Sequence, residues 1–228
     1  MARSRQTDCR HEPEHDCRLC PRLRSFALQN RKLFPEWHNA PVETWYPPAG
    51  PSAVELFIVG LAPGLRGANR TGIPFIGDES GTLLHQTLAR HGLARQSLQS
   101  DSADRPTLNG TAITNAVRCV PPENKPVGAE INTCRKFLVA TINRMPELKV
   151  IVTLGKISHD STIRALGGKI AHHPFRHAAE TEIGSIRILS SYHCSRYNIN
   201  TGRLTPQMFD TVFQKAVRSL GPGPASWT

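Results

Sequence analysis

Short apolar segments alternate with amphipathic ones along this chain. The apolar segments are rich in β-branched and aliphatic residues and are bounded by turn residues, which predicts buried strands. They are Val54–Leu61, Thr111–Val117, Lys149–Leu154 and Ile186–Ser190. Between or after them apolar residues recur at helical spacing, which predicts helices over Ser80–His91, Gly128–Arg144, Lys156–Leu166 and Pro206–Leu220. The alternation indicates an α/β fold with a mostly parallel sheet sandwiched by helices.

The two ends of the chain depart from this rhythm. Residues 1–50 are rich in prolines and aromatic residues, and we expect them to form an irregular N-terminal arm. Residues 221–228 are rich in glycine and proline, which predicts a flexible tail. A chain of 228 residues is long enough for one sizeable α/β domain, and we expect a single domain over residues 1–220.

Charge narrows the choice of partners. The 28 Lys and Arg residues exceed the 18 Asp and Glu residues, so the formal net charge is +10 and the sequence pI is about 9.8. This balance favours a polyanionic partner, with nucleic acid ahead of a membrane surface. No apolar run reaches the roughly 18 to 20 residues of a membrane span. The first twenty residues also lack the apolar stretch of a signal peptide, so we expect a cytoplasmic protein without disulfides.

Four cysteines form two pairs that suggest a metal centre. Cys17 and Cys20 form a C-x2-C turn, and Cys119 and Cys134 follow about a hundred residues later. One such turn presents two thiolates to one metal centre, so the second pair would fasten the N-terminal arm to the distant core. One C-x2-C turn with two separate cysteines fits a cuboidal iron–sulfur cluster better than zinc. Spacing alone leaves zinc and unrelated thiols open.

The first loop after a predicted strand is dense in glycine. In a parallel sheet, ligands bind in the loops beyond the carboxyl ends of the strands. The loop over residues 60–81 permits close approach of its backbone to a ligand, but it lacks the Lys-Ser/Thr ending of a nucleotide P-loop. ATP phosphate binding is therefore disfavoured. Taken alone, Asp78 and Ser80 fit N-caps of the following helix.

Two later loops carry polar side chains suited to nucleic acid. Prolines stiffen the loop over residues 118–126 and could hold Asn124, whose amide presents a donor and an acceptor to a nucleobase edge. An ordinary turn asparagine is the alternative. The loop over residues 191–205 combines His193 with arginines, asparagines and apolar residues, which suits phosphate contacts and a wedge into a base stack. Considered without the rest of the loop, a histidine such as His193 is more often a structural residue with its hydrogen bonds satisfied than a functional one.

In this order, the motifs resemble one family. They are C-x2-C, G-L-A-P-G, N-R-T-G-x-P-F-x-G-D-x-S-G, V-R-C-x-P-P-x-N-K-P, a fourth Cys, H-P-F-R-H and Y-H-x-S-R-x-N-x-x-T-G-R-L-T. The chain resembles the UdgB group, the family 5 uracil-DNA glycosylases, from about Cys17 to Leu220. The resemblance implies a three-layer α/β/α sandwich with a four-stranded parallel sheet. It also implies a [4Fe-4S] cluster on Cys17, Cys20, Cys119 and Cys134.

The same resemblance assigns roles in the excision of a flipped base. Phe75 would stack on the base, Asn124 would read its edge, and His193 would stabilise the departing anion. Asp78 would orient water or balance the positive charge on the sugar, so that the resemblance favours catalysis over a cap alone. The remaining pocket residues would be Gly60, Ala62 and Gly64. The DNA contacts would be Arg70, Lys125, Ser195, Arg196, Asn198 and Arg203.

Some residues depart from the family pattern or have no place in it. Family 4 relatives carry an acidic residue where this chain has Leu61, which leaves Asp78 as the nearest carboxylate in the motif. Cys9 and Cys194 have no place among the cluster ligands. The run over residues 172–177, HHPFRH, fits a structural or DNA-facing loop better than a second metal site. Lys125 is the nearby lysine that lyase chemistry would need, but a phosphate contact suits its turn better.

The resulting prediction is a monomeric, monofunctional glycosylase that excises uracil from DNA and so starts base excision repair. Hypoxanthine, xanthine and ethenocytosine are further candidate substrates, since the group resembles enzymes that accept them. The alternative is a non-catalytic iron–sulfur module that binds DNA or senses redox state.

Overall fold

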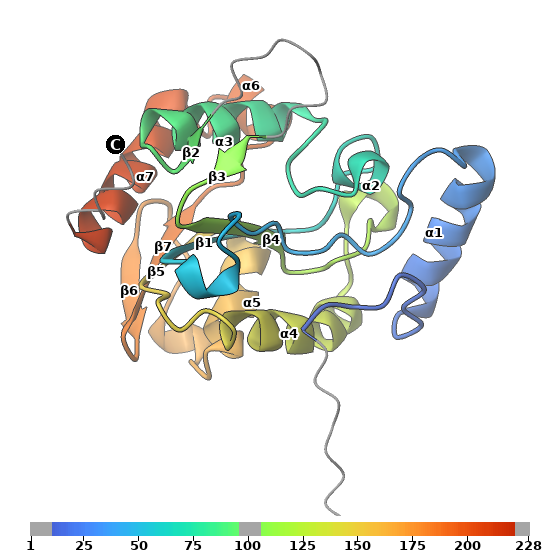
Figure 1. Ribbon diagram of the computed structural model, residues 1–228, viewed down its shortest axis with the longest axis horizontal. Coiled ribbons are helices and arrows are strands. Elements are labelled where there is room, and N and C mark those ends of the chain that lie inside the picture. The colour runs from blue at the N-terminus through green and yellow to red at the C-terminus, as the bar shows by residue number, and fades with distance from the viewer. Residues whose placement is uncertain (1–10, 96–105, 222–228) are drawn as a thin grey trace, which may run out of the picture.

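The computed structural model describes residues 11–95 and 106–221 (Figure 1). The predictions about Cys9 and about a flexible tail beyond Gly221 lie outside these residues. Helices pack on both faces of a central sheet (Figure 1). On one side lie α3 (Glu79–Arg90) and α7 (Pro206–Leu220), and on the other lie α4 (Gly128–Ile142) and α5 (Lys156–Ala165). The predicted three-layer α/β/α sandwich is confirmed.

Within the described residues the central sheet has five strands in the order β4-β1-β5-β7-β6. The strands are β1 (Leu56–Gly60), β4 (Thr111–Asn115), β5 (Val150–Leu154), β6 (Glu180–Ile183) and β7 (Ile186–Ser191). The four predicted strands are present and parallel to one another. The predicted total of four was wrong, because the sheet has a fifth strand, β6. β6 pairs antiparallel with β7 at the edge. Its sequence, ETEI, alternates exposed and half-buried residues and lacks the apolar run that marked the buried strands.

The four predicted helices are α3 (Glu79–Arg90), α4 (Gly128–Ile142), α5 (Lys156–Ala165) and α7 (Pro206–Leu220). Alternate side chains of each strand enter different cores. In β1, Leu56 and Ile58 pack with α3 and α7, whereas Phe57 and Val59 pack with α4 and α5. This period of two places both faces of the sheet in apolar surroundings, which explains why the strand sequences are almost continuously apolar.

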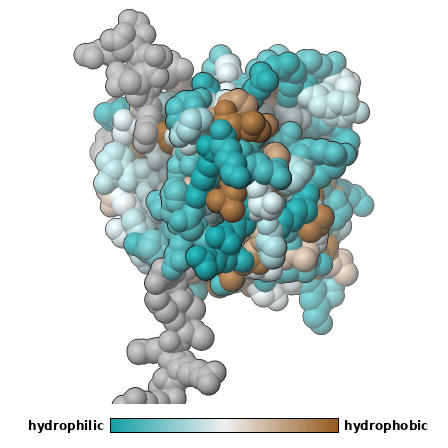
Figure 2. Space-filling model, turned by 90° about the vertical axis from the view of Figure 1, so that its right-hand side faces the viewer, coloured by the Kyte–Doolittle hydropathy of each residue, from teal (hydrophilic) through white to brown (hydrophobic). Residues whose placement is uncertain are grey.

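The N-terminal arm is more regular than predicted. Residues 21–33 form α1 (Pro21–Leu33), which begins with proline at its first position, a favourable place for that residue. The helix was missed because its buried residues are only Leu23 and Asn30, which give a weak apolar period. Figure 2 shows the end of the molecule where α1 lies as a largely hydrophilic surface with separate apolar patches.

Buried polar contacts fasten the arm to the core. The Arg118 side chain is almost fully buried, and its Nη1 donates to Glu12 Oε2 at 2.6 Å and to Thr44 Oγ1 at 2.9 Å. Its Nη2 donates to Thr141 Oγ1 of α4 at 2.9 Å. Because an unpaired buried charge is costly, removal of either Arg118 or Glu12 should loosen the arm.

Short elements complete the described parts of the chain. They are α2 (Ala68–Thr71), α6 (Arg196–Asn200), the small pair β2 (Ala94–Arg95) and β3 (Thr107–Leu108), and 3-10 turns at Pro51–Ala53, Pro122–Asn124 and Ile170–His172. No helix in these parts has both the length and the apolar character to cross a bilayer.

Candidate active site

A pocket of about 630 Å³ lies beyond the carboxyl ends of the parallel strands. It brings together residues from the three loops that the sequence singled out. Its lining comprises residues 61–68, Phe75, Asp78, Glu79, Ser80, Asn115, Asn124, His193, Ser195 and Arg196. Ligands of parallel α/β sheets bind at this end, so the pocket is the candidate active site.

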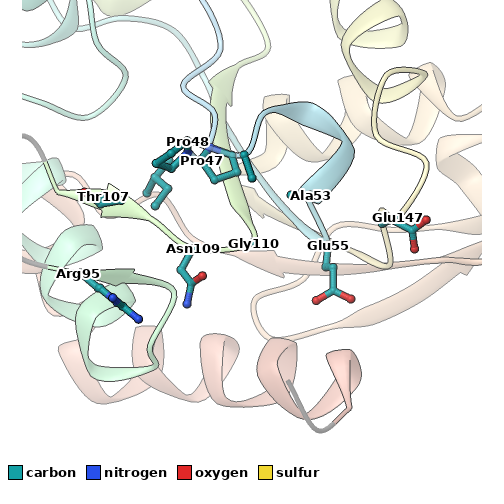
Figure 3. A pocket seen from close by; sticks show the side chains of 11 residues that line it. Pro47, Pro48, Ala53, Glu55, Arg95, Thr107, Asn109, Gly110 and Glu147 are labelled. Atoms are coloured by element: carbon teal, nitrogen blue, oxygen red, sulfur yellow. The ribbon is translucent and has the colours of Figure 1, made fainter. Parts of the chain in front are cut away.

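A second cavity, of about 500 Å³, lies at the opposite end of the sheet (Figure 3). Its lining includes Glu55 and Gly110, which directly precede β1 and β4, together with Pro47 and Pro48. Figure 3 shows Glu55, Arg95 and Asn109 along this cavity, and its described lining contains none of the predicted site residues. Its position at the amino ends of the strands also argues against a catalytic role.

Phe75 forms one wall of the active-site pocket, and Gly60, which was predicted to line the pocket, lies against the Phe75 ring outside the lining. Gly60 is the last residue of β1 and pairs with Asn115 of β4. A Cβ atom at Gly60 would lie 2.6 Å from the Phe75 ring and 2.5 Å from Asn115 Oδ1, so only glycine fits. Gly60 therefore acts by leaving room, and it is Phe75 that presents a flat surface to a ligand.

The Phe75 ring faces the imidazole of His193. The two rings are inclined by 26° with their centroids 6.1 Å apart. The Phe75 backbone has a φ of 58°, which is uncommon for a bulky residue, and its carbonyl oxygen lies 3.0 Å from His85 Nε2. Strained backbone positions persist only where their surroundings fix them, and the contact with His85 is one such restraint on Phe75.

His193 follows β7, and its imidazole is uncharged at pH 7. Burial lowers the pKa of His193, although the carboxylate of Asp78 acts in the opposite direction. The Asn198 amide donates to the His193 carbonyl oxygen at 2.8 Å and so fixes the chain at this point. A neutral imidazole can donate one N–H to a carbonyl group that gains negative charge.

Asp78 divides its carboxylate between structure and pocket. Oδ1 accepts from the backbone N–H of Gly81 at 3.0 Å and caps α3. Oδ2 faces the glycine loop, where a Cβ atom would lie 3.2 Å away at Gly64 and 2.4 Å away at Gly67. The two predicted roles, cap and pocket carboxylate, are therefore geometrically compatible. Ser80 lines the pocket and is not the N-cap.

Two asparagines reach the pocket, and the sequence identified one of them. Asn124, predicted to read the edge of the base, lies in the Pro-rich turn and is exposed at the rim of the pocket. Asn115 was missed, although it is only 3% exposed and ends β4 beside Gly60. A polar residue at the carboxyl end of an otherwise apolar strand was the signal that could have found it.

The predicted DNA contacts are spread over and around the mouth of the pocket. Ser195 and Arg196 line it, and the Arg196 guanidinium forms an ion pair with Glu79. Lys125 is 81% exposed in its side chain. Asn198 is bonded to His193, which makes it a support for the loop.

Arg70 and Arg203, like Lys125 and Asn198, lie outside the pocket lining. Arg70 is exposed and its Nε donates to the Arg66 carbonyl oxygen. Arg203 lies over the Tyr192 ring, with its guanidinium carbon 4.7 Å from the ring centroid. The expected insertion loop over residues 195–205 includes the short helix α6.

The HHPFRH run packs beside the strand that carries His193. The Tyr192 backbone N–H donates to His177 Nδ1 at 3.1 Å, and the two rings stack. His173 Nδ1 lies 2.5 Å from Thr181 Oγ1 of β6. These contacts fit the first of the two roles predicted for this run, a structural or a DNA-facing loop.

Cys17, Cys20, Cys119 and Cys134 all line one small pocket between the arm and the core. That lining contains no carboxylate or imidazole, so the donor set is entirely sulfur. Burial, with the neighbouring cysteines, raises the pKa of Cys20 to about 11 and also raises that of Cys119. In the described residues no group of three or more His, Cys, Asp or Glu is placed to hold a metal ion. A four-iron cluster takes one thiolate per iron, so its ligands are spread more widely than those of a single ion.

Cys194 is buried, and its Sγ lies 3.5 Å from the Ser80 carbonyl oxygen. Burial raises the pKa of this thiol to about 12, so it is protonated and unreactive at neutral pH.

The fold and pocket define an α/β/α protein that presents an aromatic ring, amides, an imidazole and a carboxylate to a ligand. The family model of the uracil DNA glycosylase superfamily matches residues 47–217. The chain belongs to this superfamily, and its relatives place it in the type-5 group. The match begins after the first cysteine pair.

The relatives cover most of the chain. A type-5 uracil-DNA glycosylase of Thermus thermophilus is 40% identical over 90% of this chain and 94% of its own length. A type-5 uracil-DNA glycosylase of Pyrobaculum aerophilum is 32% identical over 90% of both chains. A type-4 uracil-DNA glycosylase of Sulfurisphaera tokodaii is 30% identical over 80% of this chain and 77% of its own length.

Proposed function

We propose that this protein is a monofunctional glycosylase that removes uracil from DNA at the start of base excision repair. The observation that carries the proposal is that Phe75, Asp78, Asn124 and His193 line one pocket. A base must leave the duplex to reach such a pocket. The bond between C1′ and the base nitrogen then breaks, the base departs as an anion, and water adds to C1′ and loses a proton.

His193 would stabilise the departing base. As a neutral imidazole it donates an N–H to the carbonyl oxygen on which negative charge develops. Removal of one such preorganised donor typically costs 10² to 10³ in rate. Asp78 would stabilise the other half of the reaction, because a carboxylate offsets the positive charge on the sugar and orients the attacking water.

Asn124 and Phe75 would recognise the base. The aromatic ring stacks on any flat heterocycle, and the rim amide supplies a donor and an acceptor. Because stacking is tolerant and the cavity is roomy, we extend the proposal to hypoxanthine, xanthine and ethenocytosine. We also propose that Asn115, which lines the same pocket, supplies a second amide to the base.

The cofactor we propose is a [4Fe-4S] cluster held by Cys17, Cys20, Cys119 and Cys134. The lining of their pocket supports it, because it offers four thiols and no carboxylate or imidazole. When bound, the cluster would cross-link the arm to the core through its iron–thiolate bonds. Iron and acid-labile sulfide analysis of anaerobically purified protein tests this, with about four irons per chain expected. Stoichiometric zinc without iron would contradict the cluster.

DNA binding would use the positive charge near the pocket mouth. Arg196 and Lys125 are the nearest candidates for phosphate contacts, with Arg70 and Arg203 farther out. We propose a monomer acting in the cytoplasm, on the chromosome when bound to DNA.

The decisive assay exposes labelled duplexes containing U·G, U·A, hypoxanthine or ethenocytosine to the protein and then to alkali. We expect cleavage of uracil duplexes only after alkali, and a His193→Ala variant about 10² to 10³ times slower with similar DNA affinity. Strand cleavage without alkali would indicate lyase chemistry, with Lys125→Ala as its check. DNA binding without excision would favour the non-catalytic iron–sulfur module.

A further inference from the structure

The turn that carries Asn124 has an unfavourable backbone. Glu123 and Asn124 have φ values of 55° and 57°, in the left-handed region that favours glycine. Both backbone N–H bonds that close the turn are local, from Asn124 to the Pro121 carbonyl oxygen and from Lys125 to that of Pro122. A conformation of this kind persists where contacts from outside fix it.

Such a contact comes from α1, more than a hundred residues earlier. Arg22 Nη2 donates to the carbonyl oxygen of Lys125 at 3.0 Å. Lys125 directly follows Asn124, so this bond fastens the chain immediately after the amide. Arg22 itself lies two residues after Cys20 and is the second residue of α1, the helix that follows the first cysteine pair.

A buried carboxylate holds Arg22 in place. Its Nε and Nη2 donate to the two oxygens of Glu130, each at 2.8 Å. The Glu130 side chain is 6% exposed and also accepts from the Val127 N–H at 2.9 Å, at the start of α4. Burial opposes ionisation of Glu130, but Arg22 and the Val127 N–H hold its pKa below the usual value. The pair is therefore charged at neutral pH.

We propose that Arg22 is a positioning residue for base recognition, acting through the Lys125 carbonyl group to hold the Asn124 amide at the pocket rim. The proposal rests on the proposed function. The planar guanidinium suits the task because one fork binds a carboxylate with two bonds while another N–H reaches a carbonyl group. The N-terminal arm thus contributes to the pocket without touching the base.

The competing interpretation is that Arg22 only stabilises the arm. Arg31 provides the matched control, because it lies on the same helix and ties it down elsewhere. Its Nη1 binds Asp16 at 2.5 Å and its Nε donates to the Asn39 carbonyl oxygen at 2.9 Å. Loss of Arg31 should weaken the arm while leaving the Asn124 turn fastened.

The test measures single-turnover excision of uracil and hypoxanthine by the cofactor-loaded full chain. The variants are Arg22→Ala, Arg22→Lys, Arg31→Ala, Asn124→Ala and the double variant Arg22→Ala with Asn124→Ala. We expect Arg22→Ala to lose about tenfold on uracil and to change the ratio of the two rates, since small misplacements of a positioning group are costly. Arg22→Lys should fall between it and the parent. Arg31→Ala should lower the melting temperature with an unchanged ratio.

The double variant decides between the interpretations. If Arg22 acts through Asn124, Arg22→Ala should cost less than about twofold once the amide is absent, since coupled residues are not additive. A further tenfold loss when Arg22→Ala is added to Asn124→Ala would overturn the proposal. Equal ratios of the uracil and hypoxanthine rates for Arg22→Ala and Arg31→Ala would also overturn it. If Arg22→Ala fails to fold, the same cycle with Arg22→Lys separates the two interpretations by the same criteria.

Failure of this inference is distinct from failure of the proposed function. A parent protein that excises no base removes the function itself. An active parent with additive Arg22 and Asn124 losses removes only the positioning role. Iron content and melting temperature, measured on every variant, show whether the arm has remained attached.

Discussion

At the residue scale, glycines set how closely the pocket side chains approach one another. A Cβ at Gly81 would lie 1.9 Å from the Phe75 carbonyl oxygen, and one at Gly67 would lie 2.4 Å from Asp78 Oδ2. Both residues that these glycines accommodate belong to the candidate active site. The glycine-rich loop therefore shapes a pocket for side chains, whereas the sequence suggested only that its backbone could approach a ligand.

Gly60→Ala should damage excision much more than folding. The new methyl group would push on the Phe75 ring and the Asn115 amide, and we expect a loss of about 10² in single-turnover rate on uracil. Gly128→Ala is the control, because a Cβ there meets no atom within 4 Å. Equal rates for the two variants would contradict this account of the wall.

Asp78→Asn separates the cap from the chemistry. An asparagine oxygen can still accept from the Gly81 N–H, so the free energy of unfolding should stay within about 1 kcal/mol of the parent. The negative charge is lost, so uracil excision should fall by orders of magnitude while lesion-duplex binding is retained. Thermal melts, anisotropy and single-turnover rates measure the three quantities. A folded variant within a few-fold of the parent rate would remove Asp78 from catalysis.

At the scale of elements, the sequence predicted the strands and helices that bury much apolar surface and missed those that bury little. The four parallel strands and their four helices were recognisable because both faces of the sheet are buried. β6 and α1 were missed because they lie at the periphery and bury few apolar side chains. Boundaries shifted too, since Val54 and Glu55 precede β1.

The convergence of the candidate site residues on one pocket was predictable for a similar reason. Asp78, Asn124 and His193 lie in loops that follow parallel strands, and such loops converge at one edge of the sheet. Asn115 is the last residue of β4, but the strand was predicted to continue to Val117, so no loop signal marked this position. The Arg22 link was unpredictable because the contact joins residues 103 apart in the chain.

The starts of α3 and α6 face each other through the ion pair of Glu79 and Arg196. Glu79→Gln should release Arg196 for phosphate contact and tighten binding to DNA. The slope of log affinity against log salt should steepen by about one. Glu182→Gln, which removes a partner of Arg187 on the β6–β7 hairpin, is the control with the same charge change. Identical salt slopes in both variants would show that only net charge matters.

At the scale of the whole molecule, burial of histidines makes stability depend on pH. Burial lowers the pKa of His85, His159, His177 and His193 from the ordinary value of 6.5. The unfolded chain therefore binds more protons than the folded chain once the pH falls through about 6.5. Stability rises with pH across that window and is lost as the solution becomes more acidic.

Melting temperatures measured from pH 8 to pH 5 at constant ionic strength should therefore be flat above about pH 7 and fall below about 6.5. Parallel iron analysis separates this effect from loss of the proposed cluster. A melting temperature that stays constant down to pH 5 would contradict neutral histidines in the folded state.

The distant ion pairs of the arm also set an order of events during synthesis. Glu12 and Arg22 precede their partners Arg118 and Glu130 by 106 and 108 residues. At the usual 5 to 20 residues per second, about 5 to 20 s pass on the ribosome between the first and the second member of each pair. If the proposed cluster joins the two cysteine pairs, the first pair would be made well before the second, and its thiols would be open to oxidation during that interval. Slow translation between residues 20 and 134 would lengthen that exposure.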